Sequence, residues 1–147
     1  MDKKIVTKKG MIYYDEALKS IVALWNDRFM LQGEYRETIN KALDLLDETK
    51  ATSFITDTRN SKVLSQDQQK FQIEELFPRF MNSSLKRAAY VMPKDIFVQS
   101  AVNRSLGELT KYIEVQQFDD LESAKTWIRE RNIELHQEKN QNEDSNE

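Results

Sequence analysis

The chain has 147 residues, enough for one domain with its own core, and its 39% hydrophobic and 32% charged residues are typical of a folded protein. No apolar run is long enough to span a bilayer, no apolar segment follows the first lysines as a secretory signal requires, and the absence of cysteine excludes disulfides and thiolate sites. These features predict a cytoplasmic protein without a membrane span.

The net charge of −3 is concentrated at one end of the chain. Residues 138–147 carry four acidic residues and one lysine, which together account for −3 and leave the rest of the chain neutral. A neutral body offers no electrostatic footprint for DNA or RNA, so we expect no nucleic-acid partner. The ends predict a basic arm over residues 1–10 and an acidic, disordered tail over residues 138–147.

In chain order, the first expected elements are a hairpin and a helix. Residues 11–15 and 20–25 are rich in β-branched and aromatic side chains and flank a polar turn, which predicts two antiparallel strands. After Gly33, apolar residues recur at three- and four-residue spacing: Tyr35, Ile39, Ala42, Leu43 and Leu46. This period indicates an amphipathic helix.

The middle of the chain predicts a strand, a helix and a second strand. Residues 53–58 and residues 87–92 are short apolar strands, and Pro93 ends the second one. Between them, Ser65 and Gln68 form a capping box that begins a helix. We expect a kink at Pro78. The expected buried face is Ile73, Leu76, Phe77 and Phe80.

The last expected elements are a helix, a strand and a helix. The helix after Pro93 is expected to bury Phe97, Ala101, Val102, Leu106 and Leu109. Residues 113–118 alternate apolar and polar, which suits an edge strand. Asp119 and Glu122 are expected to cap the final helix. Its expected inward residues are Leu121, Ala124, Trp127, Ile128 and Leu135.

This alternation of strands and helices predicts one α/β domain over residues 11–137. We expect a mixed, mostly parallel sheet of about five strands with about four helices, in which the first strand is antiparallel to its neighbour.

Three segments carry a resemblance to a known family: residues 53–60 (SFITDTRN), 74–79 (EELFPR) and 118–127 (FDDLESAKTW). Over residues 11–128 the chain resembles SpoIIAA-like domains, in particular a bacterial branch related to both STAS and CRAL-TRIO domains. The resemblance implies a β-α superhelix that binds rather than catalyses. Relatives that act as anti-sigma factor antagonists carry a D-S-x-G-type motif with a phosphorylated serine. Only Asp57 matches that motif well, so this switch is not carried over.

Residues suited to catalysis or to binding a metal are few. His136 is the only histidine, which leaves too few ligands for a histidine metal site and no companion for a catalytic triad. Asp119 and Asp120 stand where a helix begins, so capping explains them better than acid–base chemistry does. The three glycines are too far apart for a phosphate loop. We therefore predict no catalytic residues, no metal and no cofactor.

The first candidate site is the loop that follows the strand over residues 53–58: Asp57, Thr58, Arg59, Asn60 and Ser61. Open α/β sheets gather ligands at the carboxyl ends of their strands, and a helix amino terminus favours anions. Arg59 could make a forked contact with a carboxylate or phosphate. The alternative interpretation is that Asp57 and Arg59 only satisfy their own turn.

The second candidate site is a bulky apolar set: Phe71, Phe77, Phe80, Met81 and Phe97. Its members could pack in the core, line a pocket for an apolar ligand, or form an exposed dimer patch. Two functions follow. The first is a regulatory module that binds another protein, or a second copy of itself, through the loop and the second helix. The alternative is a binder of a small, lipid-like molecule between the second and third helices.

Overall fold

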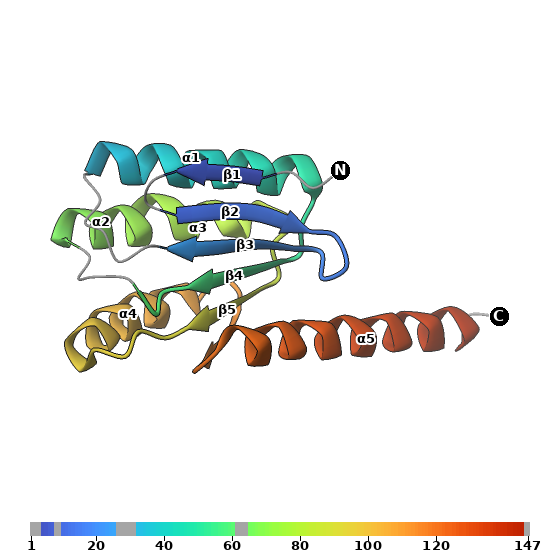
Figure 1. The fold of residues 1–147 in the computed structure, drawn as a ribbon. Coiled ribbons are helices and arrows are strands. Elements are labelled where there is room, and N and C mark those ends of the chain that lie inside the picture. Colours follow the sequence, from blue (N-terminus) through green and yellow to red (C-terminus); the bar gives the residue numbers. More distant parts are fainter. Residues whose placement is uncertain (1–3, 8–9, 26–31, 61–64, 146–147) are drawn as a thin grey trace.

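The computed structural model describes residues 4–7, 10–25, 32–60 and 65–145 of the chain. Six strands and the helices between them follow one another along these segments (Figure 1). The elements are β1 (Lys4–Thr7), β2 (Gly10–Asp15), β3 (Ser20–Trp25), α1 (Gln32–Thr49), β4 (Ser53–Asp57), α2 (Gln66–Phe71), the π-helix η1 (Gln72–Leu76), α3 (Phe77–Met81), β5 (Arg87–Val91), α4 (Ile96–Leu109), β6 (Glu114–Phe118) and α5 (Leu121–Ser145).

The strands form one mixed sheet in which the spatial order is the sequence order, β1 to β6. Strands β1, β2 and β3 pair antiparallel, and β3, β4, β5 and β6 pair parallel. The α/β class, the antiparallel hairpin and the mostly parallel sheet are thus confirmed. The sheet has six strands where about five were expected, because the basic arm contains β1, where Ile5 lies opposite Ile12. Its β-branched residues favour a strand despite the adjacent lysines.

Helices α1 to α4 cover one face of the sheet and α5 covers part of the other (Figure 1). Right-handed crossovers that each advance one strand in the same direction place their helices on the same face. The larger core, which includes Ile21, Leu46 and Leu109, lies under α1 to α4. The smaller core lies under α5 and consists of Leu18, Val22, Ile55, Ala89, Val91, Ala124 and Ile128.

The helical segment between β4 and β5 changes its pitch in the middle. The Ser65–Gln68 capping box begins it as predicted. The expected distortion near Pro78 takes the form of the π-helix η1, whose wider turn bonds the Phe77 amide to the Gln72 carbonyl five residues earlier. Phe71 and Leu76, which an ideal α-helix would turn to different sides, are both buried as a result.

Helix α5 corrects two expectations about the carboxyl-terminal part of the chain. The segment from residue 138 onward was expected to be disordered, but α5 continues to Ser145. Its glutamate, glutamine and lysine residues have high helix propensity, which low apolar content does not cancel. Leu135 was expected to face inward, but its residue is 40% exposed, because the helix has by then run past the sheet (Figure 1).

Candidate functional site at the carboxyl-terminal edge of the sheet

The loop predicted as a binding site begins with a forked ion pair. Asp57, the last residue of β4, is buried in register between Leu24 and Val91. The Arg59 guanidinium donates from Nε to Asp57 Oδ1 at 3.0 Å and from Nη2 to Asp57 Oδ2 at 2.7 Å. The Arg59 backbone amide donates to the same Oδ1 at 3.1 Å. One carboxylate therefore satisfies both the turn and the guanidinium.

This pairing determines what Arg59 offers to a ligand. Its side chain is 36% exposed, and its hydrogen bond to Asp57 raises the pKa of the guanidinium, with a further contribution from Asp57 charge and from Asp120. A guanidinium committed to a neighbouring carboxylate has fewer donors left for an incoming anion. The geometry thus agrees with the interpretation that Asp57 and Arg59 satisfy their own turn.

The other residues of the predicted loop divide between structural and exposed positions. Thr58 is buried, and both its backbone amide and its hydroxyl donate to the Val91 carbonyl, at 2.9 and 2.7 Å. Asn60 is exposed. Ser61 lies outside the described residues. The loop is therefore tied to the end of β5, and Asn60 with the outer part of Arg59 is its accessible portion.

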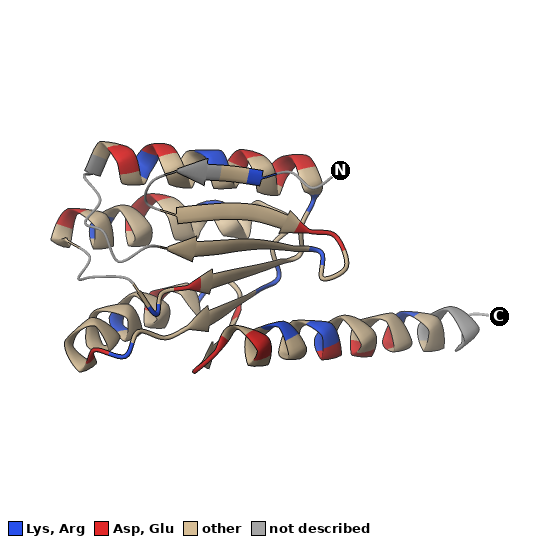
Figure 2. Ribbon diagram, viewed as in Figure 1, with Lys and Arg blue, Asp and Glu red and all other residues tan. Residues whose placement is uncertain are grey.

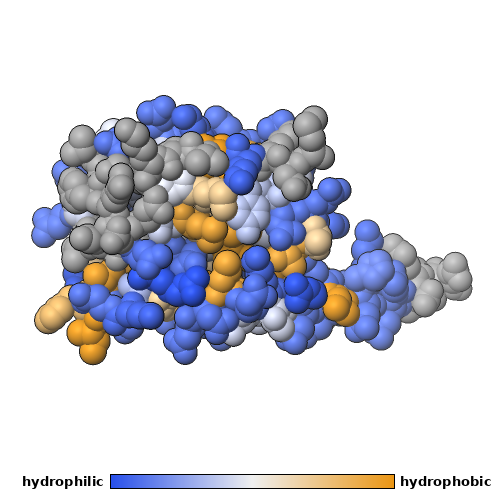
Figure 3. Space-filling view, in the orientation of Figure 1, coloured by the Kyte–Doolittle hydropathy of each residue, from blue (hydrophilic) through white to orange (hydrophobic). Residues whose placement is uncertain are grey.

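Two adjacent large apolar residues stand at the same edge of the sheet, where α4 begins. Ile96 is 71% exposed and Phe97 is 80% exposed. The Asp95 carboxylate caps this helix by accepting from the Phe97 amide at 2.8 Å and the Val98 amide at 3.4 Å. Hydrophobic side chains protrude at this end of the molecule in Figure 3. Phe97 was predicted as a possible member of an exposed patch, whereas Ile96 was not predicted to lie on a surface.

The expectation that Phe97 faces inward is wrong by one residue of helical phase. The buried stripe of α4 is Val98, Val102, Ser105, Leu106 and Leu109. Because Ser105 is polar, this stripe is hard to recognise in the sequence. The spacing of Phe97 and Ala101 with Leu106 and Leu109 is equally regular there, so the sequence pattern alone does not distinguish the two faces.

The bulky apolar set does not come together as one site. Phe71, Phe77 and Phe80 are buried, and their rings pack in the core. Ring centroids lie 6.2 Å apart for Phe77 and Phe80, and 6.1 Å apart for Phe80 and Phe54. Met81 is 66% exposed, so it does not share this environment. Three of the five residues are thus core, and Met81 and Phe97 lie on the surface.

Sequence reasoning also missed two polar clusters that lie wholly or partly within the core. In the first, Gln72 of the π-helix donates to the Tyr35 hydroxyl, and Tyr90 hydrogen-bonds Thr56. Burial raises the pKa of Tyr90 to about 12 and raises that of Tyr35 as well. Both phenols therefore stay neutral at ordinary pH. They act as hydrogen-bonding groups within the core.

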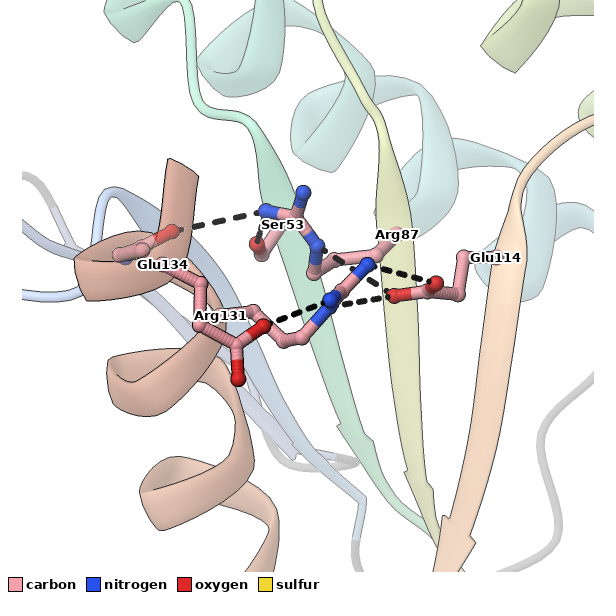
Figure 4. Close-up of polar contacts among 6 residues, drawn as sticks. Ser53, Arg87, Glu114, Arg131 and Glu134 are labelled. Carbon is pink, nitrogen blue, oxygen red and sulfur yellow. Dashed lines mark hydrogen bonds and ion pairs between the residues drawn. The ribbon is translucent and has the colours of Figure 1, made fainter. Parts of the chain in front are cut away.

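The second cluster lies at the opposite end of the strands, where α5 crosses the sheet (Figure 4). Arg87, only 5% exposed, donates to Ser53 Oγ at 3.4 Å and to Asn132 Oδ1 at 3.5 Å. Arg131 donates from Nε and Nη2 to the two carboxylate oxygens of Glu114, at 3.1 and 3.0 Å. An arginine inside an otherwise apolar strand was the available sequence signal. The cluster joins α5 to β4, β5 and β6.

Among the residues that the structure describes, no three histidine or acidic side chains stand close enough to hold a metal ion. Within the same residues, no helix combines the length and the apolar character needed to cross a membrane. Comparisons of the chain with family models, curated proteins and solved structures found no match.

Proposed function

We propose that the chain is a non-enzymatic, regulatory binding module, related to SpoIIAA-like domains, that holds a partner protein at the carboxyl-terminal edge of its sheet. One observation carries the proposal: Ile96 and Phe97 are neighbours and both are mostly exposed. Large apolar side chains gathered at an exposed site are typical of protein–protein contacts. The resemblance to STAS-type domains supports the same class of function.

The surroundings of this pair favour a preorganised surface. The Asp95 cap holds the first turn of α4, and the two Thr58 hydrogen bonds hold the neighbouring loop against β5. A partner would therefore meet Ile96 and Phe97, and also Asn60 and the outer part of Arg59, on backbone that these hydrogen bonds already hold in place. Preorganisation reduces the entropic cost of binding.

The alternative function, binding of a lipid-like molecule between the second and third helices, has less support. Such a ligand needs apolar side chains that line open space. Phe71, Phe77 and Phe80 instead pack against neighbouring rings, and Phe71 meets the Tyr35 ring edge-on with centroids 5.8 Å apart. The fifth member, Phe97, points to solvent from another element.

The test is capture of partner proteins by the immobilised full chain from the cytosol of its source organism, read by mass spectrometry. Phe97→Asp should abolish capture, whereas Met81→Asp, at another exposed apolar position on α3, should not. Both variants should keep their unfolding free energy within about 0.5 kcal/mol of the wild type, as surface changes do. Equal capture by wild type and Phe97→Asp, or no specific capture at all, would refute the proposal.

A further inference from the structure

Among the residues that the structure describes, no helix covers the part of one sheet face that lies beside α5. Helix α5 contacts β4, β5 and β6, and Val22 of β3 is buried in the core beneath it. Within the described ranges, no helix covers the same face of β2 or the Leu24 end of β3 (Figure 1). Cross-strand partners share a face, so the register that pairs Tyr13 with Val22 and Met11 with Leu24 places all four on this side. Met11, Tyr13 and Leu24 are only partly buried. Figure 3 shows hydrophobic atoms exposed in the middle of this face.

The open half-face, defined by Met11, Tyr13 and Leu24, has a basic rim. Lys4 lies opposite Tyr13 on β1 and is exposed. The rest of the rim comes from α5, whose rotation two contacts determine. Arg131 points toward Glu114 on β6, whereas Asn132 reaches the other way and donates to the Leu18 carbonyl at 3.0 Å, in the β2–β3 turn.

Residues seven and three positions before Asn132 share its side of the helix. These residues are Lys125 and Arg129, so the side of α5 that borders the open half-face carries two positive charges. Figure 2 shows that the strands between this helix and Lys4 carry no charge except at their ends. The surface is therefore an apolar floor between basic edges.

The same chain contains a segment that complements this surface. After Asn132, α5 runs on for residues 133–145, which we call the overhang, and it leaves the sheet at the hairpin end (Figure 1). Leu135 continues the spacing of Ala124 and Ile128, the residues that pack on the sheet, yet is exposed. From residue 133 to the end, the sequence has five acidic residues and one lysine.

The dimensions also agree. Thirteen helical residues extend about 20 Å, and a six-residue strand such as β2 has about the same length. Three strands side by side are about 14 Å wide, which accommodates one helix of about 10 Å diameter. Because the overhang leads away from its own sheet, it cannot reach its own open half-face.

We propose that two copies of this chain form a symmetric dimer in which the overhang of each copy lies across the open half-face of the other. The two-fold axis is perpendicular to the sheet and passes beside the β2–β3 turn, so the hairpin ends of the two sheets face each other. Strands β1 to β3 of one copy then lie in line with α5 of the other copy. Leu135, in the first turn of the overhang, then lies at the hairpin end of the other copy's half-face, on the side of Tyr13. The rest of the acidic overhang runs on toward Leu24 and Met11 beside the basic rim. The contact forms twice, as in any isologous interface.

This dimer is independent of the partner site proposed above. The overhang leaves at the hairpin end of the sheet, and Ile96 and Phe97 stand at the opposite end. Failure of one proposal therefore leaves the other intact, because oligomeric state and partner capture are measured separately.

The test is the dissociation constant of the full chain by sedimentation velocity over a range of concentrations, with a dimer as the expected species. Lys125→Glu with Arg129→Glu, and separately Leu135→Asp, should each weaken the dimer at least about tenfold. Lys70→Glu with Arg104→Glu, which reverses two exposed charges on α2 and α4, should not. A monomeric wild type, or a dimer that none of these changes weakens, would overturn the proposal.

A cross-linking experiment can place the overhang directly, because the chain has no cysteine of its own. A Leu135→Cys chain and a Tyr13→Cys chain are mixed and treated with a short bismaleimide. The expected product is a covalent pair containing one chain of each kind. If only pairs of identical chains form, or if a single chain carrying both changes links to itself, the exchange of overhangs is excluded.

Discussion

Arg87 lies almost fully buried with its Nε 3.8 Å from Glu114 Oε1, and the same carboxylate is held in a forked contact by Arg131. Two guanidinium groups thus share one acid. Desolvation lowers the pKa of Arg87, the charge of Glu114 opposes this shift, and that of Arg131 adds to it. Glu114 is therefore the counter-ion that permits a positive charge under α5.

Removing this counter-ion should destabilise the fold. Glu114→Ala leaves Arg87 buried without an acid nearby, and we expect the free energy of unfolding to fall by about 1–3 kcal/mol, less than for a fully buried pair because Glu114 is half-exposed. Urea denaturation measures the change. Lys111→Ala, which removes an exposed helix-end ion pair with Glu108, is the control and should cost less than about 1 kcal/mol.

The double variant Arg87→Met with Glu114→Ala separates the charge from the packing. Methionine keeps an apolar stem of similar length without a charge to solvate, so the double variant should recover much of the stability that Glu114→Ala loses. If the two changes instead add, Arg87 does not depend on Glu114.

Removing the Arg59 side chain from its ion pair with Asp57 should also reduce stability. Arg59→Ala leaves the buried Asp57 carboxylate with the Arg59 backbone amide as its remaining donor in this turn. We expect a loss of about 1–2 kcal/mol in thermal or chemical unfolding. Asn60→Ala, at the exposed neighbouring position, should change stability by less than about 0.5 kcal/mol. If the Arg59→Ala chain is as stable as the wild type, the guanidinium is not needed for the turn and is again a candidate for binding a ligand.

Helix α5 should be anchored by Ile128 more than by Trp127. Ile128 is fully buried, so Ile128→Ala should cost about 2–5 kcal/mol. Trp127 is partly exposed and packs on one face against Phe118 with ring centroids 5.7 Å apart. Trp127→Ala should therefore cost only about 1–2 kcal/mol. The reverse order in guanidinium unfolding would mean that the helix is rotated relative to the sheet.

Stability should decline at alkaline pH because Tyr35 and Tyr90 have raised pKa values in the folded protein. The folded pKa of Tyr90 is raised to about 12, whereas an exposed tyrosine titrates near its ordinary value of 10. Above pH 10 the unfolded chain loses a proton that the folded chain keeps, so the stabilisation present below pH 10 disappears as pH approaches 12. Tyr90→Phe should flatten this decline in urea titrations. An unchanged slope would show that Tyr90 is accessible to water.

Local patterns predicted most of the elements, and contacts distant in sequence account for what was missed. The Ser65–Gln68 capping box and the hairpin depend on neighbours a few residues apart, and both are present. The Tyr35–Gln72 hydrogen bond joins residues 37 positions apart, and Asn132 meets Leu18 across 114 positions. No window of sequence contains such pairs.

In the candidate site, too, local patterns predicted the position of the residues, whereas tertiary contacts determine how their side chains are placed. Its place at the end of β4 followed from the alternation of strands and helices, but the sequence does not say whether Arg59 faces outward or back to Asp57. The exposure of Phe97 depends on one step of helical phase, which tertiary packing decides.

The sequential order of the strands has a consequence for synthesis on the ribosome. Each strand from β2 to β6 pairs with the one made just before it, so the sheet can grow in the order in which the chain emerges. Helices α1 to α4 can cover one face of the sheet as soon as each is synthesised. The other face, which includes Ile55 and Val91, stays uncovered until α5 has been synthesised. During that interval the nascent chain should expose this apolar face to chaperones, which site-specific cross-linking of stalled chains ending before residue 121 would detect.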